Sequence, residues 1–279
     1  MRVKLKVKSL FKKEVISMAA TQELFEFAYC ALYDDRIKGL AETLAAPEQW
    51  DFGNPQVKKY SILKNYIEHT FRKQKSDRQL QFSKNNEWCC FNTGLMTTHY
   101  EYIFALFEKN KKTPSKSPFD LKGFFKQSDR NLAGKFPDVN FPEPPNYFKD
   151  PSLLIFNPTL EIEPQYEHIF GDNFLRFPTQ LHAYGEAVLR KLVIGAIDET
   201  KKRLRANYKL AVPQYFNGQI QLLIPIFLTE GSEIADLALP VYLQSFSSKR
   251  YSARTCLTIP MAYNNARLIV KPCSEWLQP

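Results

Sequence analysis

The apolar and polar pattern of the chain is clearest around an Asn217-Gly218 pair. The flanking segments, Tyr208–Phe216 and Gln219–Leu228, are both rich in residues that favour β-strands. Asn-Gly suits the two central positions of a type I′ turn, where both residues need φ > 0. The pattern therefore predicts a β-hairpin. From Gln221 onward the second arm is too continuously apolar for a strand with one wetted face, so we expect it to be largely buried.

Helical periodicity predicts three longer helices. The first is Thr21–Tyr33, and the second begins at Asn54-Pro55, where Asn suits the N-cap and Pro the first turn, and runs to about Lys73. The third and longest is Leu181–Ala206, with its apolar residues along one face. Gly195 within it would let another backbone approach closely.

Shorter apolar runs between turn signals predict further strands. An Asn92-Thr93-Gly94 turn or bulge follows the first of them. The expected strands besides the hairpin are Glu87–Phe91, Tyr100–Phe107, Phe119–Lys126, Leu153–Phe156, Ala235–Leu243, Tyr251–Ile259 and Arg267–Val270. The order of elements predicts an α+β fold, with N-terminal helices and a small hairpin region, then a long helix packed on a mainly antiparallel C-terminal sheet.

The 279 residues suffice for one large domain or two smaller ones. We interpret residues 1–20 as a basic N-terminal arm and residues 21–279 as a single α+β domain. Six prolines between Pro137 and Pro158 exclude a regular helix there. That stretch is an extended surface segment or a boundary near 137–158 between two halves. Four interpretations of this arm stay open. It is a disordered segment, an extension ahead of a domain that starts near Met18, an arm that binds nucleic acid, or a short edge strand.

Composition excludes several classes of protein. The mean hydropathy is −0.37 and no run approaches 18 apolar residues, so we expect no membrane-spanning helix. Lysines interrupt the apolar residues of the N-terminus, which argues against a secretory signal. The five cysteines lack zinc-ligand spacing and the four histidines form no metal motif, so no metal or cofactor is evident. An odd number of cysteines favours the reducing cytoplasm.

The formal net charge of +9 is unevenly distributed along the chain. Lys109–Lys135 and Arg190–Lys209 are strongly basic, whereas Phe141–Asp172 is acidic. Basic blocks suit a polyanion such as RNA, DNA or a phosphorylated nucleotide ligand. The alternative is a solvated basic surface with no specific partner.

The residues around His168 form the first candidate site. His168 and Asp172 are the candidate catalytic pair, because a histidine can move a proton near neutral pH and a carboxylate can orient it. Asn173 and Arg176 follow closely, and an arginine can hold a phosphate with two hydrogen bonds. The alternative is a local network of caps and salt bridges around a turn.

Three other polar groups could bind a base, a ribose or a phosphate, or could simply cap turns and anchor aromatic rings. Asp236 in an apolar strand should either pair with a cation or be functional, and Arg267 is a candidate partner if the two strands are neighbours. The candidate substrate-binding residues are Asn92, Thr93, Asn173, Arg176, Asn207, Tyr208, Tyr263, Asn265 and Arg267.

Five sequence blocks together resemble a widespread family catalogued as a domain of unknown function. The resemblance covers about Ala41 to Leu277. Its blocks are FNTGL at 91–95, HIFGDNFLRFP at 168–178, NYKLAVPQYFNGQIQLLIPIFL at 207–228, ADLAL at 235–239 and TCLTIPMAYNNARLIVKP at 255–272. Members of that family are often joined to cold-shock or other small RNA-binding modules, which implies work on or near RNA. The resemblance supplies no catalytic residues.

Three hypotheses follow for function. The first is an RNA-binding or RNA-processing protein that uses a basic surface and a polar site. The second is a nucleotide-dependent enzyme in which His168 acts as acid and base while Arg176 and Arg267 hold phosphate. The third is a non-catalytic protein-interaction module, for which a large exposed apolar patch without a polar pocket would be typical. Whether the chain is an enzyme stays open.

Overall fold

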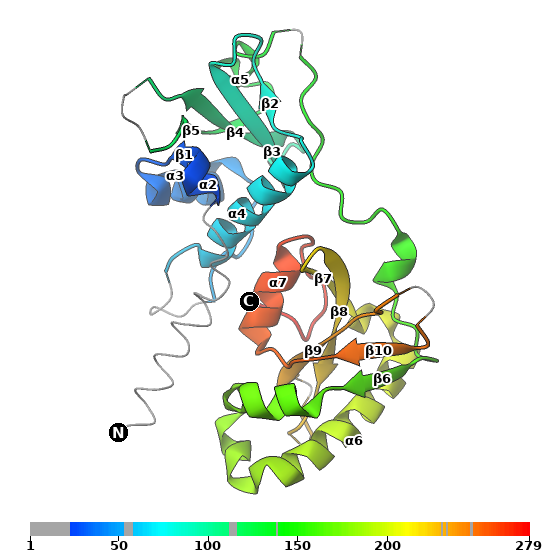
Figure 1. Ribbon diagram of the computed structural model, residues 1–279. Helices are drawn as coiled ribbons and strands as arrows, with labels where there is room; N and C mark the ends of the chain where they lie inside the picture. Colours follow the sequence, from blue (N-terminus) through cyan, green and yellow to red (C-terminus); the bar gives the residue numbers. More distant parts are fainter. Residues whose placement is uncertain are drawn as a thin grey trace, which may run out of the picture. The chain divides into compact units, whose positions relative to one another are not determined.

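The computed structural model describes residues 23–52, 58–111, 116–137, 139–229, 231–232, 234–245 and 248–279. The basic arm at 1–20 and the Asn54-Pro55 helix start lie outside the described residues. The chain divides into two compact units, Met1–Pro145 and Asn146–Pro279 (Figure 1). This boundary falls within the range 137–158. Helices and strands occur in both units, which confirms the α+β class.

The first unit begins with short helices that differ from the predicted Thr21–Tyr33 helix. The described part of that helix ends at Phe27, because Ala28 and Tyr29 extend to pair with a strand and Leu32 takes a left-handed φ of 51°. The later helix is confirmed, although its described part starts at Ser61 and ends at Ser76. The elements are α2 (Glu23–Phe27), β1 (Ala28–Tyr29), α3 (Tyr33–Gly39), the π-helix η1 (Leu40–Leu44) and α4 (Ser61–Ser76).

A sheet with the order β1-β5-β4-β3-β2 forms the centre of this unit. Its remaining strands are β2 (Gln81–Phe82), β3 (Trp88–Met96), β4 (Tyr102–Lys109) and β5 (Phe119–Lys126), and only the β1–β5 pair is parallel. The three strands predicted here are confirmed. The predicted turn or bulge at Asn92-Thr93-Gly94 is a bulge inside β3, since pairing with β4 resumes at Met96.

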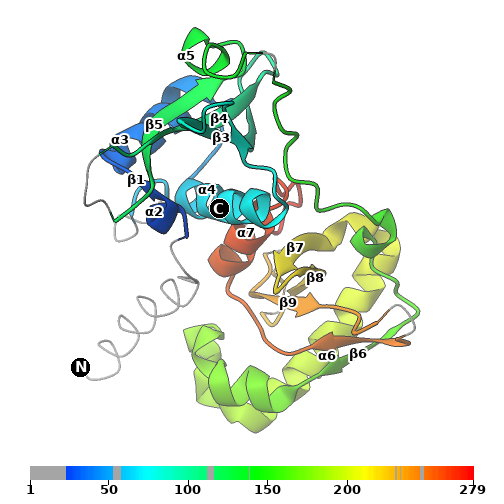
Figure 2. The same ribbon diagram turned by 45° about the horizontal axis from the view of Figure 1, so that its top comes forward.

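Both faces of this sheet are covered because its central strands are apolar on both sides. Phe91 and Phe107 pack with Phe71 of α4 on one face. Phe104 and Leu106 pack on the other, in a cluster that includes Leu132 of α5 (Arg130–Ala133). Figure 2 shows α4 and α5 on opposite sides of the strands.

Residues 139–150 of the proline-rich segment form no helix or strand, which agrees with the exclusion of a regular helix there. Two side chains hold it to the first unit: Asn92 donates to the carbonyl of Pro142 at 3.0 Å and Gln74 to that of Glu143 at 2.8 Å. The predicted strand at Leu153–Phe156 is wrong. Asp150 instead caps a 3₁₀ helix, η2, at Pro151–Leu154.

The second unit contains a long helix and a three-stranded sheet. The helix α6 starts at Gly185, where φ is 74°, after a 3₁₀ turn replaces the predicted start at Leu181. The elements are β6 (Glu161–Pro164), η3 (Glu167–Asp172), η4 (Phe174–Arg176), η5 (Thr179–Tyr184), α6 (Gly185–Ala206), η6 (Tyr208–Leu210), β7 (Val212–Phe216), β8 (Gln219–Ile226), β9 (Leu237–Val241), β10 (Arg250–Ala253) and α7 (Ile259–Arg267).

The predicted hairpin is confirmed as β7–β8, although its first arm begins only at Val212, since Tyr208–Leu210 form η6. Asn217 and Gly218 have φ values of 48° and 82°, and Phe216 pairs with Gln219 across the turn. β8 is buried from Gln221 to its end. Antiparallel pairing continues from β8 to β9, which gives the order β7-β8-β9.

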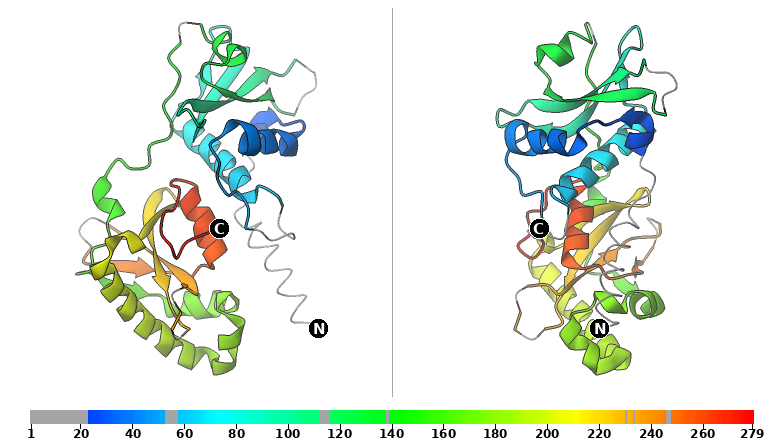
Figure 3. Two further views of the ribbon diagram at one scale, coloured as in Figure 1. Left: turned by 180° about the vertical axis from the view of Figure 1, so that it is seen from behind. Right: turned by 90° about the vertical axis from the view of Figure 1, so that its left-hand side faces the viewer.

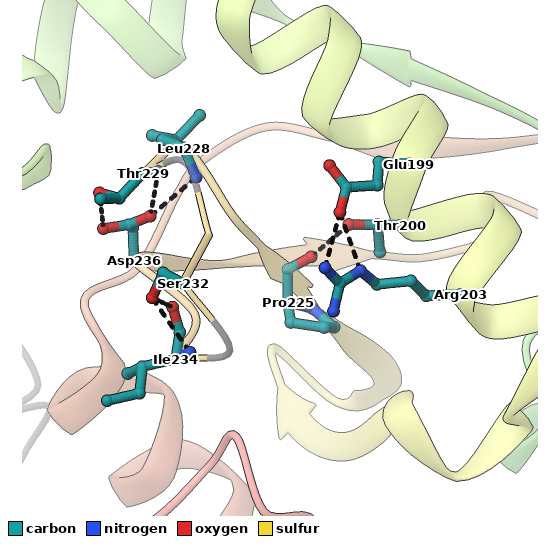
Figure 4. A network of polar contacts seen from close by, with 9 residues as sticks. All are labelled: Glu199, Thr200, Arg203, Pro225, Leu228, Thr229, Ser232, Ile234 and Asp236. Carbon is teal, nitrogen blue, oxygen red and sulfur yellow. Dashed lines mark hydrogen bonds and ion pairs between the residues drawn. The ribbon is translucent and has the colours of Figure 1, made fainter.

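The two faces of this sheet have different partners. Strand alternation places Leu222, Ile224 and Leu239 on the face that packs on Leu189 and Val193 of α6. A buried hydrogen bond also joins the layers, from Thr200 to the carbonyl of Pro225 at 2.7 Å (Figure 4). The other face is next to α7, and Figure 3 shows α6 and α7 on different sides of the strands.

Near the C-terminus one predicted strand is confirmed only in part and another is wrong. The predicted strand Tyr251–Ile259 ends at Ala253, and the predicted strand Arg267–Val270 is the end of α7 and the turn after it. Thr258 is extended ahead of α7, and a proline at the first turn starts the helix. Among the described residues, the close approach expected at Gly195 is also not found, since an added Cβ there would meet nothing within 4 Å beyond its own helix.

Buried His69 of α4 should make the first unit sensitive to acid. Burial lowers its pKa to about 4, with smaller effects from Arg72 and Lys73. Between about pH 6.5 and pH 4 the unfolded imidazole is protonated while the folded one stays neutral, so stability falls as pH falls. The loss attributable to His69 is on the order of 3 kcal/mol.

Urea unfolding of the full chain and of His69→Leu at pH 7 and pH 4.5 measures this effect, with tryptophan fluorescence as the probe. Trp50 and Trp88 both report on the first unit. The variant should lose clearly less stability between the two pH values than the parent. Equal losses would show that other groups cause the acid sensitivity.

Candidate functional site

A cavity of about 180 Å³ opens on the α7 side of the second unit's sheet. Two antiparallel bridges, Ala238 with Leu257 and Tyr242 with Ser252, hold the 252–257 segment beside β9 as one wall. All of its residues belong to the second unit. They are Gln214, Phe216, Asn217, Gln219, Gln221, Pro240, Tyr242, Arg254, Thr255, Leu257 and Asn265.

The floor of the cavity includes three buried carboxamides beside buried Pro240 and Leu257. Gln214 of β7 and Gln221 of β8 are register partners, and Gln214 Nε2 donates to Gln221 Oε1 at 2.9 Å. Asn265 comes from α7 and is 6% exposed, while Gln214 is 1% exposed. Gln214 Oε1 and Asn265 Oδ1 have no hydrogen-bond partner among the described residues. Buried carbonyl oxygens without donors are costly, so this floor is suited to a ligand that brings donors.

The mouth of the cavity is aromatic and cationic. Phe216, the last residue of β7, is 45% exposed, and Asn217, Gln219 and Arg254 are also exposed. The guanidinium of Arg254 lies 5.9 Å from the ring centre of half-buried Tyr242. Planar and cationic groups therefore surround the entrance to an amide-lined floor.

Arg176, one of the predicted residues, supports the cavity wall from behind. Its Nη1 donates to Thr255 Oγ1 at 2.9 Å and to the carbonyl of Cys256 at 2.8 Å. Burial raises the pKa of Cys256 to about 12, and the nearby Arg176 lowers it only partly. The thiol beside the cavity therefore stays protonated near neutral pH and is unsuited to act as a nucleophile.

The candidate catalytic pair lies on the surface. His168 Nδ1 and Asp172 Oδ2 are 2.9 Å apart, with side chains 61% and 71% exposed. Asn173 donates to the carbonyl of His168 at 2.6 Å, which stabilises the η3 turn. None of these residues lines the cavity. Of this block only Arg176 comes near it.

Asn92 and Thr93 belong to the first unit and serve the β3 bulge. Asn92 accepts from the amide of Gly94 at 2.9 Å, and Thr93 donates to the carbonyl of Ile103 at 2.6 Å. Gly94 has φ of 74°, and an added Cβ would lie 2.7 Å from Tyr66 Oη. Here the FNTGL block builds local structure.

The candidate residues at the end of α6 and in the C-terminal block do not come together in one site. Asn207 caps η6 by accepting from the amide of Lys209 at 3.1 Å, and Tyr208 is 59% exposed. Tyr263, Asn265 and Arg267 are all buried on α7. Only Asn265 of these lines the cavity.

The predicted pairing of Asp236 with Arg267 is wrong. Asp236 accepts from the backbone amides of Leu228 and Thr229 at 2.7 and 2.9 Å and from the Thr229 hydroxyl at 2.9 Å (Figure 4). Its carboxylate therefore stabilises the turn that follows β8.

Sequence reasoning missed Gln214 and Gln221. The signal for the glutamine pair was present, because a two-residue Asn217-Gly218 turn brings the third residue before it opposite the third residue after it. A pair of amides facing each other inside an apolar hairpin is unusual enough to indicate a site.

Several residues of the basic blocks are used in ion pairs. Lys122 pairs with Glu108 at 2.8 Å in the first unit. Arg203 pairs with Glu199 at 2.7 Å and Lys201 with Glu161 at 3.2 Å in the second (Figure 4 shows the Arg203 pair). The charge available to a polyanion is therefore smaller than the sequence count.

No group of three or more potential metal ligands occurs within the described ranges. Likewise, none of the helices in the described part of the chain has the length and apolarity needed to span a membrane. All five cysteines are free thiols.

Comparison with known protein families identifies the family of the chain. The model of a family described as a domain of unknown function (DUF3825) matches residues 41–276. The chain belongs to the DUF3825 family. The match spans every residue that lines the cavity. Neither the curated proteins nor the solved structures contain a significant match to the chain.

Proposed function

We propose that the second unit binds single-stranded RNA and takes one unstacked base into the amide-lined cavity. One observation carries the proposal. Gln214 Oε1 and Asn265 Oδ1 are buried acceptors without donors among the described residues, and both residues line the same cavity. A base edge supplies hydrogen-bond donors in one plane, and single-stranded RNA presents such edges freely.

The size of the cavity supports a base rather than a larger ligand. Its volume of about 180 Å³ is below the roughly 300–1,000 Å³ typical of pockets for drug-sized molecules. A single ring system fits this volume, while the ribose and phosphate would stay at the mouth. A continuous RNA strand can bind only if its backbone stays outside the cavity, so enclosure of the base alone suits such a ligand.

The residues of the mouth support the same ligand. Phe216 offers an exposed ring for stacking, and Arg254 offers a cation for the adjoining phosphate. The net charge of +9 adds long-range attraction to a polyanion. Binding of this kind needs no cofactor, and we propose the cytoplasm as its location.

The two alternative functions receive less support. An enzyme based on His168 would need this side chain beside a substrate pocket, and His168 is exposed and outside the cavity lining. The cavity holds several polar side chains, which is not the pattern expected for an apolar interaction module without a polar pocket. A free phosphorylated nucleotide would make the same kinds of contact with the cavity as RNA. Competition by a mononucleotide distinguishes the two ligands.

Fluorescence anisotropy tests the proposal with a labelled single-stranded RNA of about 15 nucleotides, long enough for one binding site. We expect binding that weakens by about tenfold or more between 50 and 200 mM salt, because phosphate contacts release counterions. DNA of the same sequence should bind less well. No binding by the folded protein at low salt would contradict the proposal, and equal competition by a mononucleotide would assign the cavity to a free nucleotide.

A further inference from the structure

The wall of the cavity formed by β9 and the 252–257 segment contains an irregularity in strand pairing. The two bridges that join these segments enclose three residues of β9 (239–241) and four residues of the facing segment (253–256). Between the bridges the described backbone forms no further pair. One extra residue on one of two paired strands is a β-bulge, a feature that redirects side chains and is frequent beside functional sites.

Side-chain burial locates the bulge. Ala253 and Cys256 belong to the core on the α6 side of the sheet, whereas Arg254 and Thr255 line the cavity on the other side. Successive side chains of a regular strand point to opposite faces, so two neighbours cannot both line one cavity without a bulge. The extra residue therefore places Arg254 and Thr255 side by side on the cavity face.

Pro240 faces this bulge from β9. It lies midway between the two bridged residues of β9 and lines the cavity. Proline has no backbone N–H, so it cannot donate to the facing segment, and prolines inside sheets are confined to edges and bulges. Because β9 pairs with β8 on its other side, Pro240 is accommodated by the bulge. Behind the wall, Arg176 holds the Cys256 carbonyl at 2.8 Å and so fixes the bulged segment.

The guanidinium of Arg254 is accessible to a ligand. The side chain is exposed, and its guanidinium lies 5.9 Å from the centre of the Tyr242 ring. No carboxylate in the described part of the chain pairs with it. A guanidinium held against a ring beside a pocket can donate two parallel hydrogen bonds to a phosphate.

We infer that this bulge is the phosphate subsite of the cavity, with Arg254 as the residue that binds the phosphate and Pro240 as the residue that positions Arg254. The inference rests on the proposed function. Without an N–H at position 240 the facing segment stays parted from β9, and Arg254 is directed to the mouth. The phosphate beside the enclosed base then lies within reach of the guanidinium.

The first test compares Arg254→Gln with Arg205→Gln in the full chain. Arg205 is an exposed arginine of α6 outside the cavity lining, so it is a matched control for the loss of one charge. Anisotropy titrations of a labelled single-stranded RNA at several salt concentrations give the affinity and its salt slope. Arg254→Gln should weaken binding about tenfold at low salt and reduce the slope by about 0.7, the value for one phosphate contact on a single strand. Arg205→Gln should change neither appreciably.

The second test asks whether Pro240 acts through Arg254. Pro240→Val restores a backbone N–H that can bond to the facing carbonyl, which should narrow the gap and move Arg254 away from the mouth. We expect the same reduction in salt slope as in Arg254→Gln, with no loss of stability in urea unfolding. The double variant should bind no more weakly than Arg254→Gln alone, because both changes remove one interaction. Pro240→Ala restores the same N–H without a branched side chain and should behave in the same way.

The outcomes separate the two levels of the argument. If the parent protein bound no RNA, the proposed function itself would be overturned. RNA binding with the same affinity and salt slope in Arg254→Gln would overturn the phosphate subsite and leave RNA binding intact. If Pro240→Val bound RNA as the parent does, lost affinity without a change in slope, or had a loss that added to that of Arg254→Gln, Pro240 would not position Arg254.

Discussion

Replacing Asn265 with leucine should weaken RNA binding by about fivefold to 150-fold and stabilise the fold at the same time. The loss of affinity corresponds to one buried hydrogen bond with the ligand, about 1–3 kcal/mol. The gain arises because Asn265 Oδ1 is buried without a donor among the described residues, and because leucine favours a helix more than asparagine does. We expect a gain of about 1 kcal/mol in the free energy of unfolding.

Anisotropy titration and urea unfolding measure the two effects on the same protein. Gln180→Leu is the control, since Gln180 is an exposed amide of η5 that does not line the cavity. It should change neither quantity appreciably. If Asn265→Leu lowered stability and left RNA binding unchanged, Asn265 would contribute to the stability of the fold and not to binding.

Replacing Phe216 with alanine should weaken RNA binding by about fivefold to 150-fold, whereas Tyr208→Ala should have little effect. Stacking of a base on an aromatic side chain contributes about 1–3 kcal/mol. Both rings are well exposed, at 45% for Phe216 and 59% for Tyr208, so neither truncation should disturb the core. Only Phe216 lies at the cavity mouth.

This pair of variants compares two binding surfaces directly. Tyr208 adjoins the basic end of α6, where Lys202 and Arg205 are exposed. If Tyr208→Ala weakened binding and Phe216→Ala did not, RNA would bind at the helix end. The cavity would then need another ligand.

Much of the fold could be predicted because it depends on local patterns. The Asn217-Gly218 turn requires positive φ at both positions, which few other residue pairs adopt, and the long helix shows its apolar face in the sequence. The α7 region could not be predicted in the same way. Its Tyr263-Asn264-Asn265 sequence favours turns, and the helix forms because its residues bury themselves against β7 and β9.

The candidate site was harder to predict because the sequence blocks do not converge. Polar residues such as Asn92, Asp236 and Asn207 bind nearby backbone atoms, a use that sequence spacing does not distinguish from ligand binding. Asn265 was singled out for its type, but its neighbours in the cavity come from a strand pairing and a bridge that join distant segments. Gln214 and Gln221 are recognised as a pair only when the hairpin register places them opposite each other.

The most direct test follows the side-chain amide NMR signals of the cavity during titration with single-stranded RNA. Signals of Gln214, Gln221 and Asn265 are assigned by single substitutions in protein labelled at glutamine and asparagine nitrogen. A base in the cavity predicts that these signals shift and saturate at the affinity found by anisotropy, while the exposed amide of Gln180 stays unchanged. Saturating RNA that leaves the three cavity signals in place would contradict base binding at this site.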